Sequence, residues 1–267
     1  MARKKKVFGT CRLCGKDGEL SFEHVPPQSA FNRATVIEYA LESWVTKREV
    51  KGRQRQGGIG EHTLCEQCNN DTGSWYAAEY VRWAKTAFDI LSFIRRGRNR
   101  FAGKDKVVVT LKNVYPLRFL KQVITCLVSV AGVSPGAEFA QNHPQLAEFI
   151  LDRYQIDLPP NYSVYLGLYQ SSILRRSPLS VKAPVVYGKD ESGHILPDTI
   201  RVGEGSVFSE MAHPPFLAAM TYGTSFASGT DITYFKNHEY DQQVDVELPL
   251  TIGRGPTPYP GDYQALR

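Results

Sequence analysis

The chain has 267 residues, of which 42% are hydrophobic and 22% are charged, and a formal net charge of +5. That length can bury a core in one large domain or two modest ones, and the ordinary hydrophobic content excludes a disordered protein. No apolar run approaches the roughly 20 residues of a membrane span, and no apolar signal core follows the basic N-terminus. We therefore expect a soluble, cytoplasmic protein with no membrane partner.

The positive charge is concentrated in the first part of the chain. Residues 1–106 hold 20 Lys and Arg against 12 Asp and Glu, whereas the rest of the chain holds 12 against 15. Lysine and arginine side chains that contact phosphates release counterions, which favours binding to a polyanion. The first part is therefore the part in which a nucleic-acid partner is expected.

The first half begins with short elements and ends with a long one. Residues 7–27 predict a β-hairpin, residues 35–46 fit a helix or a strand, and residues 47–60 predict a polar loop. Apolar residues spaced by three and four predict a helix over Trp75–Ile94. Glycines at 97 and 103 follow it, so we place a domain boundary near residue 105.

The second half has a different character. Residues 116–133 and 144–154 predict helices, and the chain is β-rich from residue 162 onward. The predicted strands are Ser163–Gln170, Ser180–Tyr187, Thr199–Met211, Asp231–Phe235 and Asp245–Thr251. The fold class is therefore α+β, with one domain over residues 1–105 and a mixed, β-rich domain over residues 106–267. The second domain is expected to serve sensing, oligomerisation or partner binding.

Four of the five cysteines form two C-x-x-C pairs, Cys11 with Cys14 and Cys65 with Cys68. In a cytosolic chain such pairs bind metal more often than they form disulfides. Four thiolates close a tetrahedral zinc ion without leaving a free position, so the zinc is expected to be structural. Cys126 lies in an apolar stretch and is expected to be a small buried hydrophobic residue.

Residues suited to catalysis lie beside these cysteines. Glu23-His24-Val25-Pro26-Pro27 stands between the pairs, and Asn69-Asn70-Asp71-Thr72-Gly73 follows the second pair. Together with the cysteines, these residues resemble the HNH endonucleases over roughly residues 8–85. The resemblance implies a zinc-stapled ββα-metal domain, a divalent ion on Glu23 and Asn69, and His24 as the general base.

Part of the family pattern is matched loosely. Asn70 and Asp71 are alternative ligands to Asn69 for the divalent ion. The family's middle asparagine, which orients the base, is missing before Leu64, where Glu61 or His62 could replace it.

The chemistry of these residue types suits phosphodiester hydrolysis. A histidine with an ordinary pKa can take a proton from water, and Mg²⁺ or Mn²⁺ on oxygen ligands can neutralise charge on the phosphate. Glu23 and His24 are neighbours on a predicted strand, so their side chains should point to opposite faces. Both can serve one site if the strand bends near Pro26-Pro27.

Basic clusters supply a candidate phosphate track. The residues expected to bind nucleic acid are Lys47, Arg48, Lys51, Arg53, Arg55, Arg95, Arg96 and Arg98. The sequence thus predicts a metal-dependent endonuclease acting on DNA, with RNA as an open alternative and with antiviral defence as an analogy from nuclease domains attached to sensors. The alternative is a non-catalytic, zinc-stabilised nucleic-acid-binding or adaptor protein.

Overall fold

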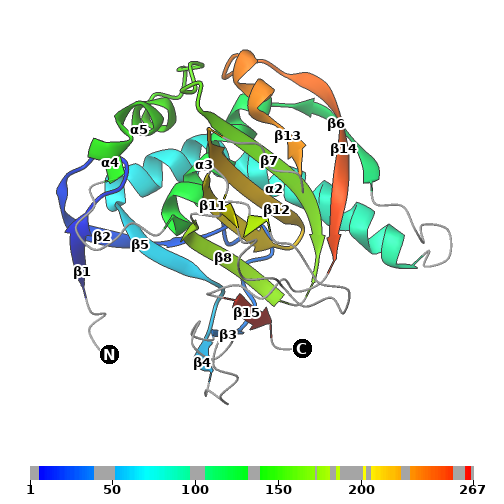
Figure 1. Ribbon diagram of the computed structural model, residues 1–267, viewed down its shortest axis with the longest axis horizontal. Coiled ribbons are helices and arrows are strands. Elements are labelled where there is room, and N and C mark those ends of the chain that lie inside the picture. The colour runs from blue at the N-terminus through cyan, green and yellow to red at the C-terminus, as the bar shows by residue number, and fades with distance from the viewer. Residues whose placement is uncertain are drawn as a thin grey trace.

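A computed structural model provides the three-dimensional structure (Figure 1). It describes residues 6–38, 52–96, 106–131, 139–171, 173–180, 185–186, 201–202, 206–223, 229–254 and 262–265. The described parts combine helices with a large, mainly antiparallel sheet, as the predicted mixture of α and β elements requires. Among the described helices, none has the length and apolar character needed to cross a membrane.

A small sheet and a long helix form the first part of the fold. β1 (Val7–Thr10) pairs with β2 (Asp17–His24), and β2 pairs with β5 (Gly60–Cys65), all antiparallel. Helix α2 (Glu66–Arg96) begins directly after β5. It starts nine residues before the predicted Trp75, so that Cys68 lies in its first turn.

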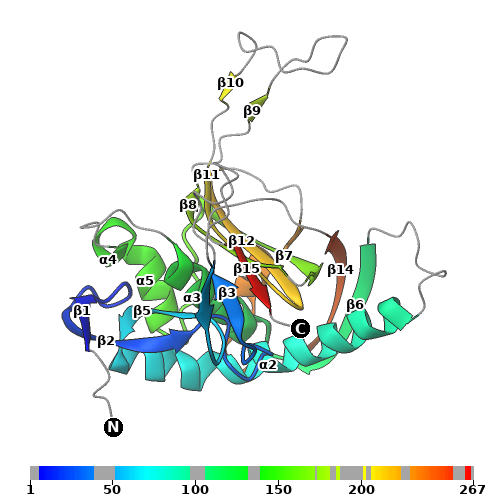
Figure 2. The ribbon, with the colours of Figure 1, turned by 90° about the horizontal axis from the view of Figure 1, so that it is seen from below.

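The large sheet draws strands from both halves of the chain (Figure 2). Its order is β4-β3-β15-β8-β11-β12-β7-β14-β6, with β13 also pairing with β7. The strands are β3 (Val36–Glu38), β4 (Arg53–Arg55), β6 (Lys106–Val114), β7 (Tyr162–Gln170), β8 (Ile173–Ser180), β11 (Ser206–His213), β12 (Phe216–Tyr222), β13 (Thr230–Asp231), β14 (Val244–Arg254) and β15 (Asp262–Ala265). A separate pair joins β9 (Val185–Val186) and β10 (Arg201–Val202).

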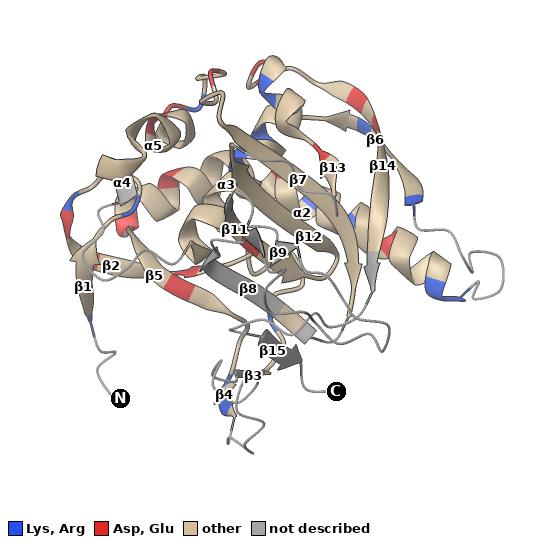
Figure 3. Cartoon of the chain, viewed as in Figure 1, with Lys and Arg blue, Asp and Glu red and all other residues tan. Residues whose placement is uncertain are grey.

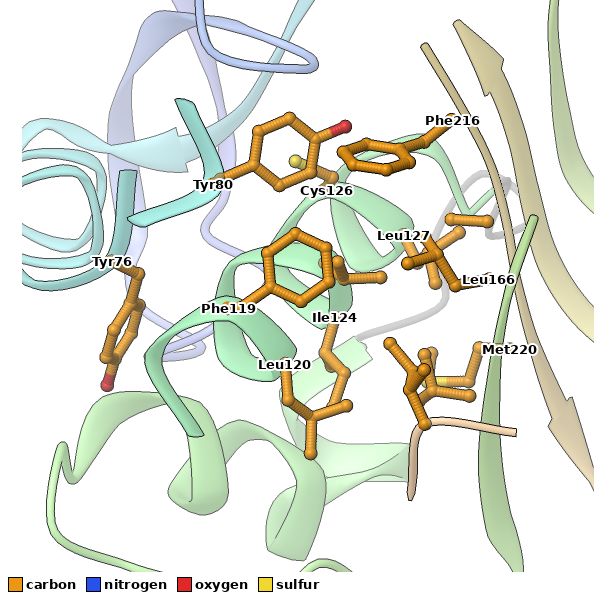
Figure 4. Close-up of a cluster of buried hydrophobic side chains, with 14 of the residues drawn as sticks. Tyr76, Tyr80, Phe119, Leu120, Ile124, Cys126, Leu127, Leu166, Phe216 and Met220 are labelled. Carbon is orange, nitrogen blue, oxygen red and sulfur yellow. The ribbon is translucent and has the colours of Figure 1, made fainter. Parts of the chain in front are cut away.

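Helix α3 (Pro116–Val130) lies at the centre of the protein, and all its residues except Arg118 are buried. It contacts α2 on one side and strands β11 and β12 on the other. Phe119 stacks on Trp83 of α2 with ring centroids 4.0 Å apart. Figure 4 shows Phe216 of β12 near Phe119, and the two rings meet edge-on. Each such side chain contributes about 1.5–3 kcal/mol through burial, so α3 joins the two layers firmly. Two short helices follow, α4 (Phe139–Asn142) and α5 (Pro144–Leu151).

The two predicted domains share a core. One cluster of buried hydrophobic residues runs from Cys11 to Leu250 and includes side chains of α2, α3 and the large sheet. In addition, β3 of the first half pairs with β15 near the C-terminus, with Val36 opposite Ala265. The boundary expected near residue 105 falls at the edge of residues 97–105, which lie outside the described part of the chain. The division into two domains therefore stays a prediction.

Some expected strands differ in the structure. The run Asp231–Phe235 was expected to be a strand, but only Thr230–Asp231 pairs, and the 3₁₀ helix η2 (Thr233–Asn237) follows. The carboxylate of Asp231 accepts a hydrogen bond from the Thr233 amide at 2.8 Å, which turns the backbone there. The expected strands over residues 180–187 and 199–211 lie partly outside the described residues, and their described parts belong to β8 and β9 and to β10 and β11. The segment around Phe216, for which the sequence predicts no strand, forms β12.

Candidate metal centre and catalytic cleft

The four paired cysteines come together at one end of the small sheet. Cys11 and Cys14 lie in the turn after β1, Cys65 ends β5, and Cys68 lies in the first turn of α2. Their sulfur atoms all lie within 4.8 Å of one another. The Gly15 amide donates to the Cys11 carbonyl at 2.9 Å, and Gly15 adopts a φ of 69°, which a residue without a Cβ allows at little cost. This turn brings the first pair to the second.

The sulfur cluster has the composition of a structural zinc site. A hydrogen bond from Cys68 lowers the pKa of the Cys11 thiol to about 4, and the same contact raises the pKa of Cys68. One thiolate is therefore stabilised by its neighbours. Burial raises the pKa of the Cys14 thiol, and the pKa of Cys68 is also raised, so these two need a cation before they lose their protons. Four thiolates in this arrangement can hold a metal ion such as zinc and leave no coordination position for water or substrate.

Glu23 lies near the end of β2 and points into the protein. Only 6% of the residue is exposed, and the Thr63 hydroxyl donates a hydrogen bond to its carboxylate. Burial raises the pKa of Glu23 to about 7, although the Thr63 and Ser129 hydroxyls and the charge of Arg12 oppose the shift. A cation beside this carboxylate would restore its ordinary ionisation.

The end of β2 is irregular. Glu23 and His24 are neighbours in the sequence and would point to opposite faces of a regular strand, so this irregularity allows both to reach one site. The pairing of β2 with β5 shifts by one residue between Ser21 and Glu23. Such a bulge bends the strand and re-aims its side chains. Glu23 and His24 both line the same cleft as a result.

His24 is half-buried, and its Nε2 atom lies 3.1 Å from the Gly57 carbonyl oxygen. A carbonyl can only accept a hydrogen bond, so we assign the proton of the neutral ring to Nε2 and the free lone pair to Nδ1. The ring of Phe22 lies against both His24 and His62, with centroid distances of 5.0 and 5.3 Å. The structure thus gives His24 a backbone carbonyl as a partner, and the orienting role expected of Glu61 or His62 stays a prediction.

Asn69 lies in the first turn of α2 and faces β2. Its Nδ2 atom donates to the Ser21 hydroxyl at 3.1 Å and, at 3.4 Å, to the Phe22 carbonyl. These bonds orient the carboxamide and leave Oδ1 as the atom available to a cation. Asn70 and Asp71 do not line the cleft, and the Asp71 carboxylate accepts a hydrogen bond from Gln67 at 2.8 Å. Of these three residues, Asn69 is the one that lines the cleft, and its role as a ligand stays a prediction.

The cleft between β2 and α2 has a volume of about 220 Å³. Its floor is supplied by α3, which lies about a hundred residues further along the chain. The residues that line it are Phe22, Glu23, His24, Val25, Pro27, Gln28, Asn69, Thr72, Gly73, Ala77, Gln122, Thr125, Cys126 and Ser129. Cys126 is buried as expected, and burial raises the pKa of its thiol to about 12.

Asn32 is a buried residue that sequence reasoning missed. Its Nδ2 donates to the carbonyls of Pro26 and Ile59, and its Oδ1 accepts from the Ile59 amide, all at 2.7 Å. These bonds tie the segment after β2 to the loop that carries Gly57. At Gly58, where φ is +95°, a Cβ would lie 2.2 Å from the Asn32 carbonyl oxygen. The Gly57-Gly58 pair predicts a turn, but no sequence pattern indicates that Asn32 packs against that turn.

The basic residues expected to bind nucleic acid are only partly described. Lys47, Arg48, Lys51 and Arg98 lie outside the described residues. Arg53 and Arg55 belong to β4, and Arg95 and Arg96 form the last turn of α2 (Figure 3). Arg95 lines a separate cavity of about 650 Å³ with Phe88 and Tyr169, and none of these four arginines lines the cleft.

No family model, no curated protein and no solved structure matches the chain. The resemblance to the HNH endonucleases is therefore carried by the motif residues alone. Any statement about activity must rest on the chemistry of the cleft.

Proposed function

We propose that the protein is a metal-dependent endonuclease that hydrolyses phosphodiester bonds, with DNA as its substrate. The observation that carries the proposal is that Glu23, His24 and Asn69 line one cleft although they come from a strand end and a helix start that lie far apart in the sequence. A base, a carboxylate and a carboxamide oxygen at one site are the groups that metal-assisted hydrolysis needs.

In this proposal His24 accepts the proton of the attacking water. The Gly57 carbonyl fixes the ring so that Nδ1 is the basic atom, and no change of tautomer is needed before proton transfer. Glu23 and the free Oδ1 of Asn69 are hard oxygen donors, which suit Mg²⁺ or Mn²⁺. A divalent ion held there would neutralise charge on the phosphate and on the leaving oxygen.

The four-thiolate site has a different task in this proposal. It holds the turn after β1 against the β5–α2 junction, and Asn69 follows Cys68 directly. Zinc in that site would therefore fix the position of Asn69 relative to β2 without taking part in the reaction. A role in antiviral defence stays a prediction that the cleft does not address.

A zinc-stabilised adaptor without catalysis is the second candidate, and the burial of Glu23 favours it. A carboxylate that is 6% exposed and bonded to Thr63 also fits a purely structural acid. The two candidates differ in what happens to nucleic acid once it is bound, so a cleavage assay separates them.

The assay incubates supercoiled plasmid and single-stranded DNA and RNA with the zinc-loaded protein in Mg²⁺, in Mn²⁺ and in EDTA. We expect cleavage with either ion and none in EDTA. His24→Ala should lower the rate by about 100-fold or more, since removal of a general base costs that much. His143→Ala is the control, because His143 contacts Tyr162 and does not line the cleft. Binding without cleavage by the wild type would favour the adaptor.

A further inference from the structure

The floor of the cleft contains a polar group that the folded protein leaves without a partner. Gln122 of α3 is only 6% exposed, and its Oε1 atom makes no hydrogen bond among the described residues. Its Nε2 atom donates to the Cys126 sulfur at 3.5 Å, so the amide group is oriented by its own helix. A buried acceptor without a donor costs about 1–3 kcal/mol, which calls for a ligand or for ordered water.

The volume of the cleft indicates an occupant larger than a single water molecule. A volume of about 220 Å³ exceeds what a single water needs, yet it is below the 300–1,000 Å³ or so of sites for drug-sized ligands. One flat ring system fits between these limits. The walls include apolar side chains of Val25, Pro27 and Ala77, so the occupant should be apolar on its faces and polar on its edge.

The rim of the cleft adds an aromatic surface. Phe22 is 43% exposed and lies beside His24. An exposed aromatic ring offers a stacking platform for a nucleobase, and such stacking does not depend on the base. Hydrogen bonds at the floor would then supply the selectivity that the rim lacks.

We propose that this cleft binds one unstacked nucleobase next to the scissile phosphate, and that Gln122 reads its edge. The inference rests on the proposed function and names the form of its substrate, which is a single-stranded or locally unpaired nucleic acid. Because Gln122 presents an acceptor, it favours adenine or cytosine, whose exocyclic amino group projects from the edge as a donor. Thymine is disfavoured because its one donor, N3–H, lies between O2 and O4, and both of these oxygens repel an acceptor. An enzyme of this kind takes its target base out of the stack, and an unpaired strand spares it the cost of unpairing.

The test measures binding, so that it does not depend on cleavage. Fluorescence anisotropy in EDTA compares labelled ten-nucleotide strands of adenine, cytosine and thymine, together with a mixed duplex of the same length. We expect the adenine and cytosine strands to bind about tenfold more tightly than the thymine strand and the duplex, which is the value of one buried hydrogen bond. Gln122→Met, nearly isosteric and without the acceptor, should bring all three strands to the thymine value.

Two controls separate reading of the base from damage to the fold. Gln145→Met makes the same change on an exposed position of α5 and should bind as the wild type does. The melting temperature of Gln122→Met should change little, because Oε1 has no partner to lose and the lost Nε2 bond is a long one to the Cys126 sulfur. If Gln122→Met binds the strands as the wild type does, or if the wild type binds thymine and duplex equally well, the inference is wrong. Selective binding without any cleavage would uphold the base site and contradict the nuclease.

Discussion

The thiolate cluster and the cleft both use residues of the first turn of α2, but they are built in different ways. The cluster is made of the turn after β1 and the β5–α2 junction, each of which holds one cysteine pair, and requires only that these two segments meet. The cleft needs a bulged strand end, a helix start and a floor from α3, whose residues follow after position 115. The comparison teaches that the first site depends on local spacing, whereas the second depends on how the whole molecule packs.

The largest effect on folding is expected from the loss of a cysteine of the thiolate cluster. Cys68→Ser should abolish binding of zinc and unfold the β1–β2–β5 region, since binding of a structural zinc is worth about 10–16 kcal/mol in small zinc domains. Metal analysis and circular dichroism measure both changes. Cys126→Ala is the matched control, because Cys126 lies outside the cluster and should leave one zinc per chain. Full zinc content in Cys68→Ser would contradict the four-thiolate site.

A smaller loss of stability is expected from a substitution at Gly60, where β5 passes close to the end of β2. A Cβ on Gly60 would lie 2.0 Å from the Glu23 carbonyl oxygen and 2.6 Å from the Phe22 ring. Gly60→Ala should therefore destabilise the protein by about 3 kcal/mol through overpacking and should disturb the cleft. Chemical denaturation measures the loss.

Replacement of Gly73 by alanine should have the opposite effect on stability to replacement of Gly60. It lies in α2, and a Cβ there would meet no atom within 4 Å. Gly73→Ala should stabilise the protein by about 0.5–1 kcal/mol, because alanine loses less backbone freedom in a helix. Equal effects of the two substitutions would show that the close approach at Gly60 is not what the structure describes.

An intermediate loss of stability is expected from breaking the link between the two regions. Arg12 lies inside the first cysteine turn, and its Nη1 donates to the carbonyls of Val128 and Ser129, both at 2.8 Å, at the end of α3. Arg12→Met should lower the free energy of unfolding by about 2 kcal/mol, since bonds from a charged donor are lost. Zinc content should stay at one per chain. Loss of zinc in this variant would mean that the thiolate cluster is less independent of α3 than we describe.

The sequence predicts the local parts of this architecture well. The proximity of Cys11, Cys14, Cys65 and Cys68 is confirmed, because a two-residue spacer defines each turn by itself. The helices α2 and α3 are also confirmed in their central parts, since their apolar residues recur at helical spacing.

The parts that depend on distant contacts could not be predicted. Gln122 falls within the helix predicted over residues 116–133, and only the packing of α3 against the other cleft residues places it in the lining. The role of Asn32 could not be predicted either, because the fold brings its hydrogen-bond partners, Pro26 and Ile59, to it. The pairing of β3 with β15 joins residues more than 200 positions apart, for which no local pattern exists.

The account claims above all that the thiolates hold the structure while the cleft performs the chemistry. Glu23→Gln tests this division most directly, because it removes only the charge of a buried carboxylate and keeps its shape. We predict one zinc per chain, a melting temperature at or above that of the wild type, and a plasmid cleavage rate in Mg²⁺ at least about 100-fold lower, as expected when a ligand of the ion is lost. A Glu23→Gln protein that loses its zinc, or that cleaves as fast as the wild type, would contradict the account.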